Sequence, residues 1–124
     1  MLSPADQTLA ALIDDLAARG LLDTTLVIAM GEFGRTPRIN GTAGRDHWPH
    51  CYTVVLAGGG IRGGTVFGAS DKLGAYPETV PITPADLAAT LFWRFGLDPR
   101  KEMSDLTGRP YKLADGQPIE RLFA

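Results

Sequence analysis

The sequence predicts an α/β fold in which a mostly parallel sheet is flanked by helices. Two apolar, β-branched runs are typical of strands buried on both faces. Two other stretches repeat apolar residues at helical spacing behind N-cap signals, and a helix followed closely by a strand is the α/β pattern. The chain has 124 residues, of which 15 are glycine and 9 are proline. It is therefore one domain, or part of one, with many shaped loops.

The first helix is predicted to begin near Ser3 and to end at Gly20. Ser3 is a suitable N-cap, and Pro4 suits the first helical position. Asp6 lies three residues after the cap and strengthens the signal. At the other end, Gly20 is a suitable left-handed stop. The apolar stripe of this helix contains Leu9, Leu12, Ile13 and Leu16.

Two core strands are predicted over residues 24–30 and 52–57, and a short third strand over residues 65–68. Residues 31–50, between the two core strands, are rich in glycine, arginine, proline and asparagine and are expected to form a long loop. Structureless loops of this length in compact domains are usually functional, so the loop is the first place to look for a site.

The second helix is predicted to begin with a capping box, in which Thr83 is the cap and Asp86 its partner, and Pro84 occupies the first turn. Gly96 is predicted to end it. Its buried face is expected to contain Leu87, Leu91 and Phe95, with Ala88 and Phe92 as further candidates. The tail from Asp98 is expected to be irregular and to dock through Leu106, Tyr111, Leu113, Ile119, Leu122 and Phe123.

Composition argues against several classes of protein. The net charge of −2 does not suit a nucleic-acid surface, where a basic stripe is expected. No apolar run reaches the roughly 18–20 residues that a membrane span needs. The single Cys51 cannot form an internal disulfide, and its position beside a core strand predicts a buried structural thiol.

Candidate site residues follow the first core strand. Glu32 comes directly after it, and ligands of open α/β sheets bind at the carboxyl ends of strands. Asp46 and His47 come later in the same loop. Imidazole is the commonest metal ligand in proteins, and Asp46 is either a second ligand or a partner that orients the imidazole. The alternative is structural, with Glu32 paired to an arginine and His47 packed under Trp48.

His50 is expected to have a structural or supporting role, because it lies just before the second core strand. Arg35, Arg38 and Arg45 place three guanidinium groups around the same loop, and arginine binds phosphate, sulfate and carboxylate through its planar fork. Arg35 lies nearest the strand end and is the best anion contact, with Arg45 as the second candidate. The alternative is that these arginines only form ion pairs with Glu32 and Asp46.

Residues 58–63 match the dinucleotide-binding pattern G-x-G-x-x-G, but the match is rejected. That mechanism needs a helix to begin at the loop, whereas the following residues indicate strand and turn. The glycines are expected to provide positive φ angles and close backbone approach. No nucleophile motif is evident, since Ser70 has no base near it in sequence, and no catalytic residue is assigned to this chain.

Several motifs resemble the C-terminal part of the DUF1501 family. They are GEFGRTP, GRDHWP and LAGGGIRGG, the Pro-Ala-Asp-Leu helix start, and the closing Gly-Arg-Pro…Leu-Phe-Ala, which together run from about Leu22 to Ala124. The family has no settled function and is placed in the alkaline phosphatase-like superfamily with sulfatases and phosphomutases. The resemblance implies that residues 1–124 are the C-terminal part of such a domain. The nucleophile and any export signal would lie in an N-terminal part, and an exported or periplasmic location is implied.

The resemblance also implies a metal site. Relatives in the superfamily carry an Asp-His-Gly metal motif where this chain has Glu32-Phe33-Gly34, so a carboxylate is kept and the histidine is replaced by Phe33. The implied ligands are Glu32, Asp46 and His47, and the metal is divalent: zinc, manganese or calcium.

Two functions are implied by the resemblance. The first is part of a metal-dependent hydrolase of phosphate or sulfate esters. The second is a non-catalytic extracytoplasmic protein that binds an anion or a sulfated or phosphorylated glycan, which the replacement by Phe33 favours. In either case the uncovered sheet edge is expected to need the N-terminal half or to cause self-association.

Overall fold

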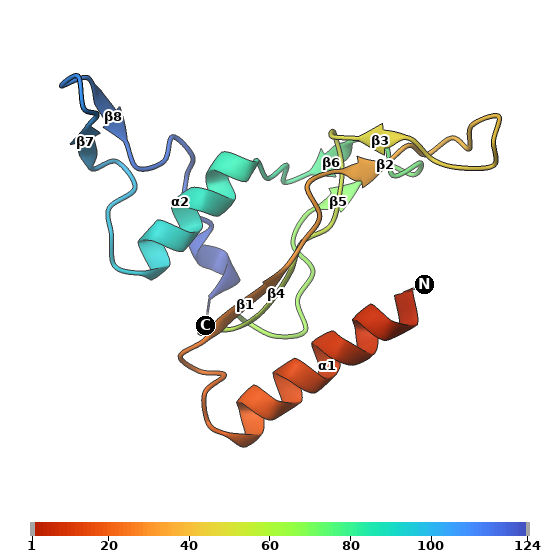
Figure 1. The fold of residues 1–124 in the computed structure, drawn as a ribbon, viewed down its shortest axis with the longest axis horizontal. Helices are drawn as coiled ribbons and strands as arrows, with labels where there is room; N and C mark the ends of the chain where they lie inside the picture. The colour runs from red at the N-terminus through yellow and green to blue at the C-terminus, as the bar shows by residue number, and fades with distance from the viewer. Residues whose placement is uncertain (1, 124) are drawn as a thin grey trace.

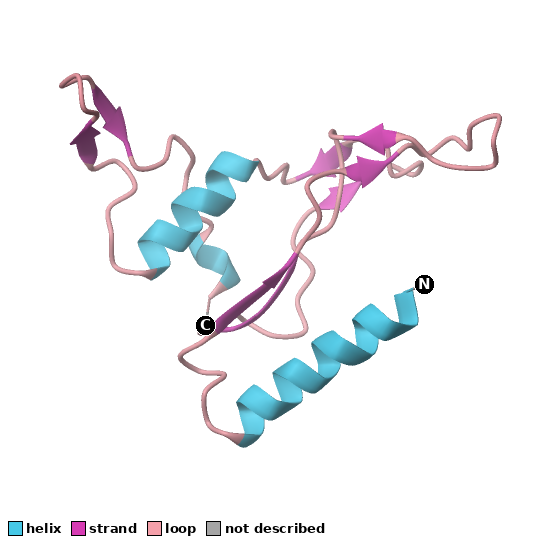
Figure 2. Ribbon diagram, in the orientation of Figure 1, coloured by secondary structure: helices cyan, strands magenta, loops and turns pink. Residues whose placement is uncertain are grey.

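The computed structural model describes residues 2–123, which contain two α-helices and eight short strands (Figures 1 and 2). The helices are α1 (Leu2–Ala18) and α2 (Pro84–Arg94), and a 3₁₀ turn, η1, spans Glu120–Leu122. The strands are β1 (Leu26–Ala29), β2 (Gly34–Arg35), β3 (His47–Trp48), β4 (Val55–Gly58), β5 (Ala69–Ser70), β6 (Pro77–Thr79), β7 (Glu102–Ser104) and β8 (Pro110–Lys112). They form four separate two-stranded antiparallel sheets: β1–β4, β2–β3, β5–β6 and β7–β8.

Helix α1 ends where the sequence predicts, but it begins earlier. Gly20 has φ +67°, and the amides of Gly20 and Leu21 donate to the carbonyls of Ala17 and Leu16. This double hydrogen bond is the Schellman arrangement that glycine favours. The helix already includes Leu2, so Ser3 lies in the first turn instead of capping it. Pro4 is therefore the third residue of the helix and not the first, and it is tolerated there because the first-turn amides have no partner within a helix.

The core strands form, but the predicted parallel sheet does not. Strand β1 pairs with β4 in the antiparallel sense, with Leu26 opposite Gly58 and Ala29 opposite Val55. Strand β4 also begins three residues later than predicted. Parallel neighbours need a crossover connection, which is usually a helix. The chain between β1 and β4 contains no helix, and it goes out and returns as a ribbon, which brings β4 back in the opposite direction. The mixture of helix and strand is confirmed.

The glycine run after β4 has the role expected of it. Gly58 has φ +72°, and a Cβ placed there would lie 2.3 Å from the Thr25 carbonyl oxygen. The amide of Gly59 donates to the Leu22 carbonyl at 2.8 Å. The run therefore closes the β1–β4 sheet tightly against the start of β1. No helix begins there, as expected from the rejected nucleotide motif.

Helix α2 is capped at both ends as predicted. The Thr83 hydroxyl accepts from the Asp86 amide, and the Asp86 carboxylate accepts from the Thr83 amide, which completes the capping box. At the C-terminal end of the helix, Gly96 has φ +77°, and its amide donates to the Trp93 carbonyl at 2.9 Å. These signals are local in sequence, so they could be read without knowledge of the tertiary structure.

The tail is more ordered than expected. Strands β7 and β8 form a hairpin whose turn is held by the Asp105 carboxylate, which accepts from the amides of Thr107 and Arg109. The predicted strand over residues 65–68 does not form, and the hairpin β5–β6 follows it instead. Both differences arise because polar turn residues, not apolar runs, fix these short hairpins.

The tail returns across α2 and is fastened there. The amide of Gln117 donates to Asp86 Oδ1 at 2.8 Å, and the amide of Ile119 donates to Thr90 Oγ1 at 3.0 Å. Thr90 is almost fully buried. Gly116 is pressed so closely on Ala85 that a Cβ at Gly116 would lie 2.2 Å from the Ala85 carbonyl carbon. The helix therefore offers side-chain acceptors to the amides of an irregular segment.

Phe123 joins the tail to both α2 and the β1–β4 sheet. The centroid of its ring lies 5.3 Å from the centroid of the Trp93 ring. Arg94 Cζ lies 5.2 Å from the Phe123 ring centroid. Arg94 Nε also donates to the Gly59 carbonyl at 2.6 Å, and Phe123 forms a β-bridge with Ile61. We call this set of contacts the Phe123 clamp.

The apolar interior is thin. Among the residues that the structure describes, the buried hydrophobic side chains are Ala75, Ala89 and Phe123. The accessible surface is 9287 Å², whereas a compact monomer of this mass exposes about 6,500 Å². No helix among residues 2–123 is both long enough and apolar enough to span a bilayer.

We expect Asp86→Asn to lower the free energy of unfolding by about 1 kcal/mol near neutral pH. Both carboxylate oxygens accept hydrogen bonds, Oδ2 from Thr83 and Oδ1 from Gln117, and an amide offers one acceptor oxygen only. The Thr83 hydroxyl, followed by the Gln117 amide, holds the pKa of Asp86 below its ordinary 3.8. The stabilisation is therefore complete above about pH 4 and is lost as pH falls through the lowered pKa.

Urea unfolding of both proteins at several pH values would test this. The difference between wild type and Asp86→Asn should shrink in acid. The control is Asp14→Asn, because Asp14 is exposed on α1 and has no hydrogen bond or ion pair within residues 2–123. Equal effects of the two substitutions, or a difference that persists at low pH, would contradict the role assigned to Asp86.

Candidate functional site

The predicted loop after β1, residues 31–50, is folded: its two arms pair through β2 and β3, and we call it the β2–β3 ribbon. Strands β2 and β3 pair with Gly34 opposite Trp48 and Arg35 opposite His47. Beyond them, the Thr36 amide donates to the Asp46 carbonyl at 3.0 Å, which extends the pairing toward the tip. Figure 1 shows the ribbon reaching away from the β1–β4 sheet. The residues that the sequence places in one loop are therefore carried on two facing arms.

Asn40 holds the tip of the ribbon together. Its Oδ1 accepts from the amides of Thr42 and Gly44 and from the Thr42 hydroxyl, at 2.9–3.1 Å. Its Nδ2 donates to Asp46 Oδ1 at 2.9 Å. The closed turn places Ala43 at φ +58°, a left-handed conformation that is uncommon for alanine. One asparagine side chain thus fixes both the turn and the orientation of the Asp46 carboxylate.

The arginines bind backbone carbonyls and not carboxylates. Arg45 Nη1 donates to the carbonyls of Thr36 and Pro37, each at 2.6 Å, and Arg35 Nη1 donates to the Arg45 carbonyl at 3.3 Å. Arg38 lines an open hollow at the tip, together with Asp46. The alternative, in which these arginines form ion pairs with Glu32 and Asp46, is wrong, since the three salt bridges among residues 2–123 lie elsewhere.

His47 stacks on Phe33. The two ring centroids are 4.0 Å apart with an interplanar angle of 30°, and Arg35 Cζ lies 5.8 Å from the Phe33 ring centroid. The side chain of His47 is exposed, and it is not packed under Trp48 as the structural alternative expected. Phe33 therefore lies within reach of both the guanidinium and the imidazole of the β2–β3 pair.

A second aromatic group joins the ribbon to the β5–β6 hairpin. Trp48 Nε1 donates to the Ala75 carbonyl at 2.6 Å. His50 lies 4.7 Å from the Trp48 ring and 5.2 Å from the Tyr76 ring, centroid to centroid. The facing turn is closed by Asp71, whose pKa is held below its usual range chiefly by the Ala75 amide. This contact agrees with the structural role expected for His50.

The predicted metal ligands are not gathered into a closed site by the residues described. Glu32 is exposed, and Asp46 already accepts from Asn40 through one oxygen. No group of three or more His, Cys, Asp or Glu side chains suited to hold a metal occurs within residues 2–123. A structural zinc site has four ligands, and a catalytic one has three plus water. These side chains therefore do not make up a complete coordination sphere on their own.

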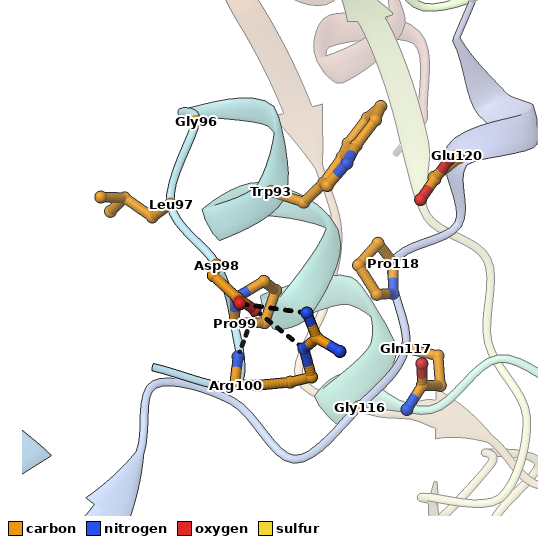
Figure 3. Close-up of a pocket in the computed structure, with 10 residues that line it drawn as sticks. All are labelled: Trp93, Gly96, Leu97, Asp98, Pro99, Arg100, Gly116, Gln117, Pro118 and Glu120. Atoms are coloured by element: carbon orange, nitrogen blue, oxygen red, sulfur yellow. Dashed lines mark hydrogen bonds and ion pairs between the residues drawn. The ribbon is translucent and has the colours of Figure 1, made fainter. Parts of the chain in front are cut away.

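A different depression, of about 550 Å³, lies between the end of α2 and residues 116–120 (Figure 3). Trp93 and Glu120 border one side of it in that view. Arg100 Nε and Nη2 each lie 3.1 Å from an Asp98 carboxylate oxygen, and these contacts lower the pKa of Asp98 and raise that of Arg100. None of the sequence-predicted site residues lines this depression, so it is separate from the ribbon.

Sequence reasoning missed two features that position the candidate residues. The Asn40-Gly41 dipeptide is a strong hairpin signal, and it could have predicted a ribbon instead of a loop. The stacking of Phe33 on His47 had no such signal, because the two residues are far apart in sequence and meet only through the strand pairing.

The side chain of Cys51 is half-buried. The Cys51 carbonyl lies where a Cβ on Gly34 would be, so β2 tolerates no side chain at position 34.

Comparison with known proteins identifies the family. The model of the family described as "Protein of unknown function (DUF1501)" matches residues 1–123. The match covers nearly the whole chain, and the protein therefore belongs to the DUF1501 family, as its motifs predict. No curated protein and no solved structure gives a match. The placement in the alkaline phosphatase-like superfamily stays a prediction.

We expect Asn40→Ala to loosen the tip of the ribbon. Removing the side chain deletes acceptors for the amides of Thr42 and Gly44, so hydrogen exchange at both amides should accelerate on the order of tenfold. Exchange measured by NMR would check this, with Ile39→Ala as the control because that side chain is 59% exposed. Unchanged protection at Thr42 and Gly44 would show that Asn40 does not hold the turn.

Proposed function

We propose that the β2–β3 ribbon is one wall of a site for phosphate or sulfate esters in a metal-dependent hydrolase. The observation that carries the proposal is the pairing of Arg35 with His47 at directly opposite positions. Opposite residues of an antiparallel pair have their Cβ atoms about 5 Å apart on the same face. A guanidinium that binds anions and an imidazole that binds metals are thus side by side at the end of a core strand.

Arg35 is assigned to the anionic group of the ester. Its hydrogen bond to the Arg45 carbonyl, at 3.3 Å, uses Nη1 and is long. The remaining nitrogens have no hydrogen-bond partner within residues 2–123, and the side chain is exposed. Arg45 is the weaker candidate, because its Nη1 is already held by two carbonyls at 2.6 Å. Arg45 instead fixes the arm of the ribbon that carries Arg35, by binding the carbonyls of Thr36 and Pro37.

His47, Glu32 and Asp46 are the side chains that would contribute to holding the metal. Asp46 is oriented by Asn40, which is the kind of outer support that ligating carboxylates have. Because these three residues do not gather into a complete site, the proposal requires further ligands from outside the ribbon. The nucleophile must also come from outside it, since no motif in this chain provides one.

The reaction class rests on the superfamily resemblance. The triplet Glu32-Phe33-Gly34 stands where that superfamily has Asp-His-Gly, at the carboxyl end of a core strand. We also propose, on the same resemblance, that residues 1–124 form part of an alkaline phosphatase-like domain. A divalent metal in such a site would stabilise negative charge that develops on the ester oxygens.

The second candidate is a non-catalytic protein of the same family that binds a sulfated or phosphorylated glycan or another anion. The observation that favours it is the stack of Phe33 on His47 at 4.0 Å. An aromatic ring here has no metal-binding atom, and it presents an apolar surface beside Arg35. Such a surface suits the combined apolar and anionic character of a substituted sugar ring.

Metal and anion binding by the purified chain would separate the two candidates. For the hydrolase we expect zinc, manganese or calcium to be retained at less than one equivalent after reconstitution, because the ribbon provides only part of a coordination sphere, and retention should fall further in Glu32→Gln and His47→Ala. The control is Glu78→Gln, because Glu78 is exposed on β6 and lies outside the ribbon. Plasma mass spectrometry after dialysis gives the metal content.

Titration calorimetry with inorganic phosphate and sulfate gives the anion binding, with Arg35→Gln expected to abolish it and Arg109→Gln to leave it intact. Anion binding that depends on Arg35, without metal, would favour the binding protein. Metal retained equally by Glu32→Gln, His47→Ala and the control would remove these residues from the metal site. The absence of both metal and anion binding would contradict both candidates for this chain.

A further inference from the structure

The tip of the β2–β3 ribbon holds the only asparagine among the 124 residues, Asn40, and Gly41 follows it directly. In such a pair the backbone amide nitrogen of the second residue can attack the carboxamide of the first, and glycine favours the attack because it has no Cβ to hinder the approach. Both reacting groups belong to adjacent residues. The reaction therefore depends on no surface or segment outside the ribbon.

The turn leaves the attacking group unused. Within residues 2–123 the Gly41 amide donates no hydrogen bond, whereas the amides of Asn40, Thr42, Ala43 and Gly44 each donate one. Gly41 is exposed, and a Cβ placed on it would meet no atom within 4 Å. An amide that has no acceptor in the ribbon can lose its proton to hydroxide in the solvent. Proton loss is the step that makes the nitrogen a nucleophile.

The same turn prepares the group that is attacked. Asn40 Oδ1 accepts from the Thr42 amide, the Thr42 hydroxyl and the Gly44 amide at 2.9–3.1 Å. Negative charge develops on this oxygen when a nucleophile adds to Cγ, and donors that already point at such an oxygen stabilise the charge. Asn40 Nδ2, the nitrogen that must leave, donates to Asp46 Oδ1 at 2.9 Å.

We propose that Asn40 is a site of spontaneous deamidation in the folded ribbon. The Gly41 nitrogen forms a bond to Asn40 Cγ, the bond from Cγ to Nδ2 breaks, and Nδ2 leaves as ammonia with the proton of the Gly41 amide. The succinimide that results takes up a water molecule. Opening of the ring at Cγ gives aspartate, and opening at the backbone carbonyl gives isoaspartate, in which the main chain runs through the side-chain carbon.

Either product puts negative charge where a donor now contacts Asp46. Asn40 Nδ2 lies 2.9 Å from Asp46 Oδ1, and two carboxylates that replaced this pair would repel each other. Isoaspartate also lengthens the main chain inside the turn that the hydrogen bond from the Asn40 amide to the Gly44 carbonyl closes. On the proposed function, in which Asp46 helps to hold a metal, deamidation deprives this carboxylate of the group that orients it.

Mass spectrometry of the purified, folded chain during prolonged incubation would test the proposal. The mass should increase by the difference between a carboxamide and a carboxylic acid, and the tryptic peptide of residues 39–45 should contain the change as aspartate and isoaspartate. The increase should be faster in mildly alkaline than in mildly acidic buffer, because the Gly41 amide must lose its proton. Isomerisation at Asp115-Gly116 would not interfere, since it leaves the mass unchanged.

Gly41→Ala should slow the mass increase severalfold, because a methyl group then hinders the attacking nitrogen. Gly41 does not have a positive φ and has open space for a Cβ, so the substitution leaves the turn intact. The matched control is Gly63→Ala, since Gly63 has the same two properties and lies outside the ribbon. It should deamidate like wild type, and circular dichroism should show that both variants are folded.

The repulsion is tested separately with Asn40→Asp, which has the charge of the modified chain from the start. It should unfold at a lower urea concentration than wild type, and added salt should reduce the difference. Adding Asp46→Asn should restore the midpoint, because the carboxamide at position 46 can then donate to the carboxylate at position 40.

Three outcomes would overturn the proposed modification: wild type that keeps its mass, a mass increase that occurs only in urea, or a Gly41→Ala variant that deamidates as fast as Gly63→Ala. An Asn40→Asp midpoint that Asp46→Asn does not restore would overturn the proposed repulsion. These measurements need neither metal nor anion. Their failure is therefore distinguishable from failure of the proposed function.

Discussion

The contacts of Arg94 with Phe123 and Gly59 join α2, the tail and the β1–β4 sheet, and the placement of α2 and the tail against that sheet depends on them. Arg94 stands at the end of α2, donates to the Gly59 carbonyl at the end of the β1–β4 sheet, and lies over the Phe123 ring. The clamp is one of few places where side chains are truly buried. In a chain with so little apolar interior, a charged group that reaches across to a backbone carbonyl replaces part of the packing that a larger core would provide.

The ribbon follows the same logic. Its arginines donate hydrogen bonds to carbonyls of the facing arm, and Asn40 closes the tip. Polar side chains therefore determine the shape of the ribbon. This explains why the candidate carboxylates, Glu32 and Asp46, form no ion pair with another residue of the described part of the chain. A scaffold held in this way keeps anionic ligand atoms available, although it does not bring them together by itself.

The parts of the fold that the sequence predicted are those decided by neighbouring residues. The caps at Thr83 and Gly96 and the stop at Gly20 depend on contacts within four or five positions, and all three are found. Strand direction depends on where the chain returns, which no local pattern records, so the antiparallel pairing of β1 with β4 was not predicted.

The same division applies to the candidate site. Its residue types could be listed from the loop composition, but not the register that places Arg35 opposite His47. The ring that stacks on His47 could not be identified either, because Phe33 reaches it only through the pairing of β2 with β3. The pairing of strands that are distant in sequence therefore decides which of the candidate site residues become neighbours.

The two tryptophans of the chain belong to different structural units. Trp93 is part of the Phe123 clamp, and Trp48 ties the ribbon to the turn before β6 through its indole N–H. Each indole is therefore an intrinsic optical reporter of one unit. Emission from a chain in which Trp48 is replaced by phenylalanine would follow the clamp alone, and the reciprocal replacement would follow the ribbon. The cooperativity between the two units could thus be observed without any added label.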